Sequence, residues 1–435
     1  MAILFCVGAV FCIFRNKGGV FVVQHAAIDI MYRAIVYNDQ SAWSEMEGDR
    51  AAEYADMRAV ICSGHSGCIN LDMGLGINSC EYVTSIFEGP RASFVSRHTG
   101  VQAILTGGRS NVRIDYSLSF DSNFAERMRA LVFRETSGGI NHERVLEVLR
   151  LKARNPYVQF DVLPFLYENV RLSRDNSENQ RPVNTLIAFR MLDEMDWEEF
   201  GDTGKLRFNL DEDRLREDLR IDAEQFISSL YTSDAIIQHE AGALGVQALL
   251  LRFANLWHES QKKEPSRILT GLLDFCVSDL GYVPMTELSL IWRGISSKVV
   301  APFFGPITGA SKDVLTKVRS MAWDIMHLRL MERLATQSNL GSFYIPYFVS
   351  LDAKWRELLR INPIRVMLLD DSQRRMLCAR SGELEFQAAF SNYVNQFPNE
   401  FSPEKVSARR KIASAPSMQR MKQLIALEEQ RWLDS

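Results

Sequence analysis

Three short apolar runs, each ending at an acidic residue, interrupt a chain that is otherwise patterned mainly for helices. Alternating or short apolar runs are typical of strands, whereas apolar residues spaced at i, i+3, i+4 and i+7 are typical of helices. The runs are residues 111–120, 344–351 and 364–369, and they end at Asp121, Asp352 and Asp370. We therefore expect a few strands among many helices, with a carboxylate at each strand end.

The helical pattern covers most of the chain after Asn123, whereas the first hundred residues differ. The stretch 58–108 carries eight glycines between short β-branched and aromatic runs, which is typical of short strands and tight turns. Helical spacing recurs in 124–134, 144–154, 183–200, 236–257, 267–277 and 314–334. The expected fold class is mixed α/β and mainly helical.

The last two apolar runs flank a helix-length stretch, residues 352–360, which has apolar side chains on one side. Strand, helix and strand in this order predict a parallel βαβ unit. In an open parallel sheet the carboxyl ends of the strands meet at one edge, where such folds place their chemistry. Acidic residues that follow different strands are therefore expected to converge.

Acidic residues stand at the positions where such convergence is expected. Asp121 and Asp352 each follow a strand-like run, and Asp324 lies in the helical stretch that leads to the second of these runs. Carboxylate oxygens are the ligands that Mg²⁺ and Mn²⁺ prefer. Such ions activate water and stabilise the charge that develops in phosphodiester cleavage. One further acidic residue would complete a four-carboxylate metal site.

The spacing of these acids resembles that of the PIN-domain ribonucleases of the VapC type. The first acid of that family appears as D-[ST]-N, as in the D-S-N that begins at Asp121. The third acid opens a helix, as Asp324 does in A-W-D-I, and the fourth follows a strand as [ST]-x-D, as Asp352 does in S-L-D. The best match to the second acid is Glu168.

This resemblance implies a PIN-like αβα layer and a metal-dependent endoribonuclease. Asp121, Glu168, Asp324 and Asp352 would be the catalytic acids and the ligands of Mg²⁺ or Mn²⁺, supported by the polar residues Asn123 and Ser350. RNA would be the substrate, and toxin or defence roles are common in proteins that resemble the family. The resemblance requires that the three strand-like runs share one sheet and that the chain near residue 121 contacts the chain near residue 352.

Two ligand positions stay open in the sequence. Glu287 competes with Glu168 for the second acid, and Asp115 could replace or assist Asp121. An Asp after a strand is also often only a turn former or a helix N-cap, which needs no metal.

The resemblance divides the chain into five parts. A long helical insertion is required because about 150 residues separate Glu168 from Asp324. The expected parts are a Gly-rich, β-containing region (1–108), a first PIN-like part (109–172), a helical insertion (173–315), a second PIN-like part (316–382) and a helical, basic tail (383–435).

Composition limits the class of protein. Fifty Lys and Arg against 54 Asp and Glu give a net charge of −4, so no global positive field attracts nucleic acid. Seven irregularly spaced cysteines argue against a secreted disulfide framework and favour the cytoplasm. The apolar run 1–14 is shorter than a spanning helix needs and lacks a preceding basic segment, and Met31 is an alternative start.

Other functions stay open at this stage. The main alternative is a non-catalytic scaffold with a degenerate PIN-like fold, whose insertion binds a protein partner or inhibitor. Membrane association through residues 1–14 is a third class. Cys62, His65, Cys68 and Cys80 are residue types that zinc accepts, although glycine-rich turns explain the same stretch. Basic residues of the tail, such as Arg409, could hold phosphates if the tail folds back on the acidic edge.

Overall fold

The computed structural model describes residues 27–47, 51–62, 71–72, 80–89, 91–135, 142–260, 263–309, 311–337 and 342–434. The apolar run 1–14 lies outside the described residues, as do His65 and Cys68 of the candidate zinc set. Met31, the alternative start, is buried inside a helix. No helix in the described part of the chain is both long enough and apolar enough to cross a membrane.

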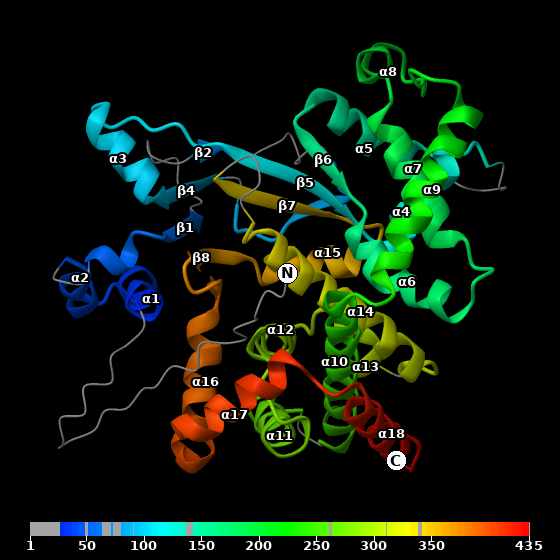
Figure 1. The fold of residues 1–435 in the computed structure, drawn as a ribbon. Coiled ribbons are helices and arrows are strands. Elements are labelled where there is room, and N and C mark those ends of the chain that lie inside the picture. Colours follow the sequence, from blue (N-terminus) through cyan, green and yellow to red (C-terminus); the bar gives the residue numbers. More distant parts are fainter. Residues whose placement is uncertain are drawn as a thin grey trace.

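Two sheets lie in the upper half of the molecule in Figure 1, with helices beside them. The five-stranded sheet has the order β2-β4-β1-β8-β9, with all its pairs antiparallel. Its strands are β1 (Met57–Cys62), β2 (Leu71–Asp72), β4 (Arg91–Ser96), β8 (Ile364–Asp370) and β9 (Arg375–Arg380). The four-stranded sheet has the order β3-β7-β5-β6 and comprises β3 (Val83–Ser85), β5 (Ile114–Phe120), β6 (Val158–Asp161) and β7 (Phe343–Val349).

The four-stranded sheet contains the pair that positions the acidic residues. β5 runs parallel to both β6 and β7, in a register that places Phe120 beside Val349. The carboxyl ends of β5 and β7 therefore lie side by side, as the sequence predicted for two of its three strand-like runs.

The predicted parallel βαβ unit is wrong, because β8 lies in the five-stranded sheet, antiparallel to β1. Both edges of β7 are occupied, one by β5 and the other by β3 from the N-terminal region, so β8 has no free edge in that sheet. The resemblance to the PIN domain required all three runs in one sheet, and only two of them meet.

Segments that are distant in the sequence share both sheets. β1 and β4 from the region 1–108 join β8 and β9, and β3 joins β7. Strands from the first and the fourth of the expected parts are thus interleaved.

Helices make up most of the described residues, so the coarse class, mixed α/β and mainly helical, is correct. Those outside the range 173–315 are α1 (Ala27–Tyr37), α2 (Gln40–Glu47), α3 (Arg97–Leu105), α4 (Ser122–Val132), α5 (Glu143–Arg154), α6 (Leu163–Asp175), α14 (Val314–Leu334), α15 (Ala353–Ile361), α16 (Glu383–Gln396), α17 (Pro403–Ser414) and α18 (Met418–Asp434). Short helical turns are η1 (Ala51–Tyr54), η3 (Cys276–Leu280), η4 (Pro302–Phe304) and η5 (Pro398–Phe401).

The range 173–315 is helical where the structure describes it. It contains α7 (Arg181–Asp193), α8 (Trp197–Thr203), α9 (Glu212–Leu230), α10 (Asp234–Glu259), α11 (Pro265–Phe275), α12 (Met285–Ser296) and α13 (Gly305–Thr308). In Figure 1, α7 to α9 cover one side of the four-stranded sheet, whereas α10 to α13 lie below it with α14 and α18. The long helix α10 packs against both α14 and α18.

Arg58 connects the two sheets. This buried β1 residue donates hydrogen bonds to the backbone oxygens of Thr336 (2.9 Å) and Ser342 (2.6 Å), just before β7, and pairs with Asp371 (2.6 Å). The two carbonyl bonds fix the entry of β7 relative to the five-stranded sheet.

We expect the Arg58→Met variant to lower the free energy of unfolding by roughly 2–4 kcal/mol, because two carbonyls lose their donor. Asp371→Asn should cost less than about 1 kcal/mol, since the Asp371 side chain is 48% exposed and such ion pairs contribute little. Urea unfolding of both variants measures the difference. Equal losses would contradict this role of Arg58.

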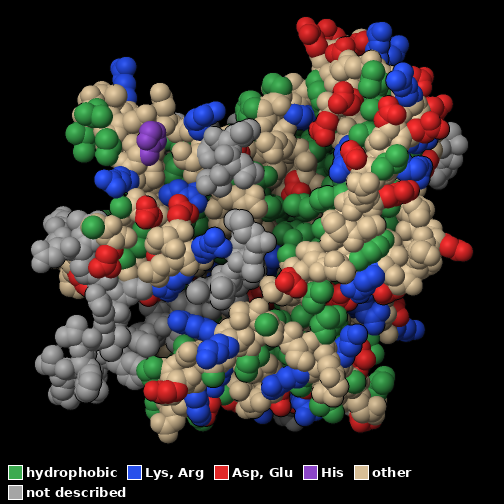
Figure 2. Space-filling model, in the orientation of Figure 1, with side chains coloured by type: hydrophobic (Ala, Val, Ile, Leu, Met, Phe, Trp, Pro, Cys, Tyr) green, Lys and Arg blue, Asp and Glu red, His purple; other side chains and the backbone are tan. Residues whose placement is uncertain are grey.

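Figure 2 shows acidic and basic side chains interspersed over the visible face, in keeping with the small net charge of −4. In the tail, Arg409 pairs with Glu400 at 2.7 Å, and at the end of β9 Arg380 is buried against Glu332. These two cations are therefore engaged in internal ion pairs.

Candidate functional site

Asp121 lies directly after β5 and is 7% exposed. Its backbone N–H donates to the Val349 oxygen (3.0 Å), which extends the β5–β7 ladder by one bond. Its Oδ1 accepts a hydrogen bond from the Phe124 N–H (2.7 Å) and so caps α4, and its side chain also hydrogen-bonds Ser350. The contact that the resemblance required between the regions of residues 121 and 352 is thus present.

Ser350 and Asp352 follow β7 on the same edge. The buried Ser350 hydroxyl accepts from the Asp352 N–H (3.0 Å), and Asp352 Oδ1 caps α15 by accepting from the N–H groups of Lys354 (2.8 Å) and Trp355 (3.2 Å). Asp352 is exposed, whereas Asp121 is buried, so the acidic edge extends from the core to solvent.

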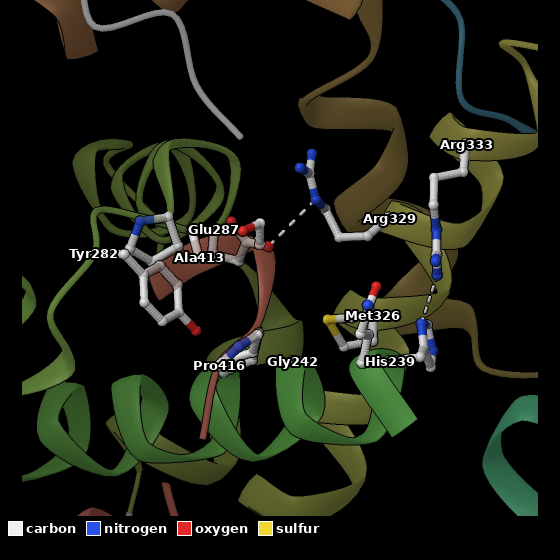
Figure 3. A pocket seen from close by; sticks show the side chains of 13 residues that line it. His239, Gly242, Tyr282, Glu287, Met326, Arg329, Arg333, Ala413 and Pro416 are labelled. Carbon is white, nitrogen blue, oxygen red and sulfur yellow. Dashed lines mark hydrogen bonds and ion pairs between the residues drawn. The ribbon is translucent and has the colours of Figure 1, made fainter. Parts of the chain in front are cut away.

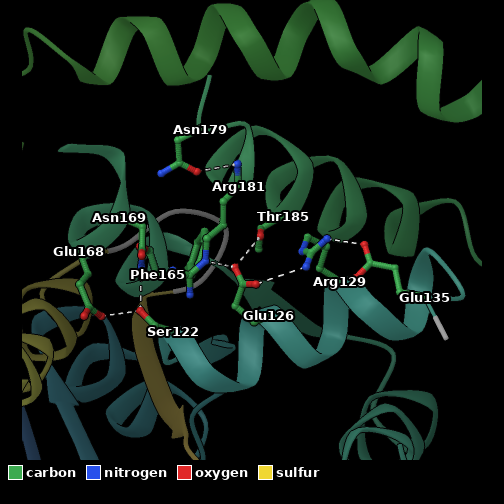
Figure 4. A network of polar contacts seen from close by, with 10 residues as sticks. All are labelled: Ser122, Glu126, Arg129, Glu135, Phe165, Glu168, Asn169, Asn179, Arg181 and Thr185. Atoms are coloured by element: carbon green, nitrogen blue, oxygen red, sulfur yellow. Dashed lines mark hydrogen bonds and ion pairs between the residues drawn. The ribbon is translucent and has the colours of Figure 1, made fainter. Parts of the chain in front are cut away.

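Glu168 reaches the same edge from α6 (Figure 4). Its carboxylate accepts a hydrogen bond from the Ser122 hydroxyl, which in turn accepts from Asn169 Nδ2 (2.8 Å). His327 Nε2 on α14 lies 3.4 Å from Glu168 Oε2. Burial alone would raise the pKa of Glu168, but the hydrogen bond and charge of His327, together with Ser122 and Arg171, outweigh it. The pKa is therefore lowered, and Glu168 is ionised at neutral pH.

Asp324 joins these groups from α14, one helical turn before His327. Burial, followed by the negative charges of Glu168, Asp352 and Asp121, raises the pKa of Asp324 well above its usual range. All four acids that the sequence singled out are therefore close enough for their charges to interact.

The pKa of Asp121 is raised as well, mainly by burial. Burial, the largest cause, and the charge of Glu168 raise its pKa to about 6, against the hydrogen bonds from Ser350 and Phe124 and the charge of His327. A pKa that is higher in the folded than in the unfolded protein favours the fold at low pH, and this stability is lost as the pH rises through the folded value.

We expect the Asp121→Asn variant in EDTA to gain stability relative to wild type as the pH rises from about 4 to about 7, by up to about 3 kcal/mol. Asn is as good an N-cap as Asp, so the capping of α4 is kept. Urea unfolding of both proteins at several pH values measures the gain. A difference that does not change with pH would contradict the raised pKa.

The other candidates lie differently. Asn123 is exposed in the first turn of α4, and no contact among the described residues joins it to the four acids. Asp115 pairs with Tyr344 at the opposite end of β5, about 20 Å along the strand from Asp121. Glu287 is buried on α12 and pairs with Arg329 at 3.5 Å, in a different cluster.

The four acids do not form a ready-made metal cage. Within the described residues, no group of three or more His, Cys, Asp or Glu side chains is placed to hold a metal ion. Asp121 and Asp352 direct one oxygen each to a helix N-terminus, and Glu168 is held by Ser122 and His327.

Sequence reasoning missed three polar neighbours of the acids: Ser122, Asn169 and His327. His327 is buried on α14, yet it contacts Glu168. The available signal was the spacing Asp324-x-x-His327, which places both side chains on one face of a helix.

Comparison with known proteins adds no relative: no family model, no curated protein and no solved structure matches this chain.

Proposed function

We propose that this protein is a metal-dependent ribonuclease whose site is the acidic edge of the four-stranded sheet. The observation that carries the proposal is the gathering of four carboxylates at this edge, where burial and, after it, the charges of Glu168, Asp352 and Asp121 raise the pKa of Asp324 well above its usual range. A cluster of mutually repelling carboxylates is costly, and a bound divalent cation would reverse that cost. A bound cation would therefore account for a cluster of acids that the fold alone does not require.

The chemistry of the four side chains, as distinct from their present placement, suits a hard divalent cation. Asp121, Glu168, Asp324 and Asp352 offer carboxylate oxygens, which Mg²⁺ and Mn²⁺ prefer. Such an ion would supply an activated water and would stabilise charge on a phosphodiester.

The neighbouring residues would orient the carboxylates. Ser122 fixes the Glu168 carboxylate and is itself held by Asn169. Ser350 hydrogen-bonds the Asp121 side chain and the Asp352 backbone, so it sets the relative position of both acids. Serine at this central position is small enough to be completely buried between the two.

Cations near the acids support a phosphate-bearing substrate. Burial raises the pKa of Glu168, whereas His327, Ser122 and then the Arg171 charge lower it. The exposed Lys354 donates its backbone N–H to Asp352. Contacts between basic side chains and phosphates position a nucleic acid without reading its sequence. RNA is the proposed substrate, and a cytoplasmic toxin or defence role, with a protein inhibitor as partner, belongs to the same proposal.

Incubation of the purified chain with labelled single-stranded RNA tests the proposal. We expect cleavage in Mn²⁺ or Mg²⁺ and none in EDTA. Cleavage that persists in EDTA, or no cleavage with either metal, would contradict it.

The alternative is a non-catalytic scaffold, and one observation favours it. Asp121 and Asp352 both cap helices, which is a common structural role for Asp after a strand. The scaffold alternative predicts a specific protein partner in pull-down experiments and no RNA cleavage.

A further inference from the structure

A second candidate site lies between α10, α12 and α14, beside the linker from α17 to α18 (Figure 3). This pocket opens to solvent and encloses about 710 Å³ of empty space when the solvent at its mouth is included. Its wall combines apolar residues such as Val246 and Met326 with the charged residues Glu287, Arg329 and Arg333. An apolar pocket with a few convergent polar groups is typical of a ligand-binding site.

His239 contributes a hydrogen-bond donor to this pocket. Its ring is 1% exposed, and its Nδ1 lies 2.7 Å from Arg333 Nη2, which can only donate. Nδ1 therefore accepts, and in the neutral ring the proton is on Nε2. Nε2 has no hydrogen-bond partner among the described residues. A buried N–H without a partner is costly, so it calls for an acceptor oxygen.

Glu287 contributes an acceptor at the other side of the pocket in Figure 3. It is 5% exposed, and its Oε1 lies 3.5 Å from Arg329 Nε. Its Oε2 has no hydrogen-bond partner within the described part of the chain. This oxygen calls for an N–H or O–H donor.

Two glycines of α10 shape the wall between these groups. A Cβ at Gly242 would lie 2.8 Å from Met326 Cε, and a Cβ at Gly245 would lie 2.2 Å from the Tyr282 hydroxyl. Glycine inside a helix costs about 1 kcal/mol relative to alanine. Here it allows Met326 and Tyr282 to pack against the helix and line the pocket.

We propose that this pocket binds a small molecule that carries an anionic oxygen at one end, an N–H donor at the other and an apolar body between them. The anionic oxygen would accept from His239 Nε2 beside the Arg333 guanidinium. The N–H would donate to Glu287 Oε2, and the body would pack on Met326 and Tyr282. The site is separate from the acidic edge, because α14 directs His327 to Glu168 and Arg329 to Glu287.

Isothermal titration calorimetry with two probes of this chemistry tests the proposal. Adenosine monophosphate presents a phosphate and an amine, and ε-aminocaproate presents a carboxylate and an amine. At least one of them should bind at least about tenfold more tightly than its single-ended counterparts, a difference of about 1.4 kcal/mol. Those counterparts are ribose phosphate and adenosine for the first probe, and caproate and hexylamine for the second. The probe that binds identifies phosphate or carboxylate as the anion, and binding of neither overturns the proposal.

Variants locate the binding. His239→Phe keeps a ring against Tyr167, which His239 contacts at 4.9 Å, but removes the donor, and it should weaken binding at least about tenfold. Glu287→Gln should also weaken binding. This variant takes the place of His239→Phe in the test if His239→Phe does not fold. His258→Phe, on the same helix outside the pocket, should bind as wild type does, and so should Asp121→Asn, whatever its effect on RNA cleavage. Unchanged binding in both pocket variants would overturn the assignment.

Discussion

Replacing Asp121 or Asp352 by Asn should slow Mn²⁺-dependent RNA cleavage by more than about 100-fold, since even residues that only support a metal ligand account for 10- to 100-fold. Both replacements keep the helix caps, because Asn caps as well as Asp does. The loss should therefore come from the missing carboxylate and not from a distorted fold. Initial cleavage rates, with far-ultraviolet circular dichroism as a check on folding, measure it.

Asp115→Asn is the matched control for this experiment. It makes the same change near the start of β5, about 20 Å from Asp121, which follows the end of this strand, and should leave cleavage unchanged. Cleavage by the Asp121 and Asp352 variants at the wild-type rate would remove the acidic edge from the reaction.

The Phe120→Ala variant should lower the free energy of unfolding by about 3–5 kcal/mol, the range for a fully buried aromatic residue. Phe120 is 0% exposed, and its ring lies 4.9 Å from that of Phe189 and 5.1 Å from that of Phe160. These contacts connect β5, β6 and α7, so the substitution would leave a cavity where these three elements meet. Urea unfolding measures the loss.

Leu105→Ala is the control for the core variant. Leu105 is 79% exposed at the end of α3, and its truncation should change stability by less than about 0.5 kcal/mol. A Phe120→Ala protein that is as stable as this control would show that the packing around β5 is looser than described.

The strands and the acids at their ends were predictable because their signals are local. The predicted run 111–120 corresponds to β5 (Ile114–Phe120), and the predicted run 344–351 to β7 (Phe343–Val349). The alternation of apolar residues predicted the strands, and the Asp that ends each strand is visible in the same short stretch of sequence. The expectation that such acids share one edge needed only that β5 and β7 be parallel neighbours, as they are.

The sheet that β8 joins was not predictable in this way. β8 pairs with β1, about 300 residues earlier in the chain, and an apolar strand fits either sheet equally well. β3 has only three residues, and nothing in the sequence indicates that it pairs with the edge of β7. Hydrophobic pattern determines that a strand forms, whereas long-range pairing determines which sheet it joins.

The role of His327 was missed for a related reason. A lone histidine on a mainly apolar helix fits a core position, and His327 is 1% exposed. Its contact with Glu168 depends on the packing of α14 against α6, which no local pattern reveals.

Thermal melting with and without millimolar Mn²⁺ tests most directly whether the acidic edge holds a metal. Bound metal stabilises the fold by about 2.7 kcal/mol at a hundredfold excess over Kd, so we expect the melting temperature to rise by a few degrees. Most of this rise should be absent in the Asp121→Asn and Asp352→Asn variants and present in Asp115→Asn. A wild-type melting temperature that does not respond to Mn²⁺, or an equal rise in all four proteins, would contradict the metal site.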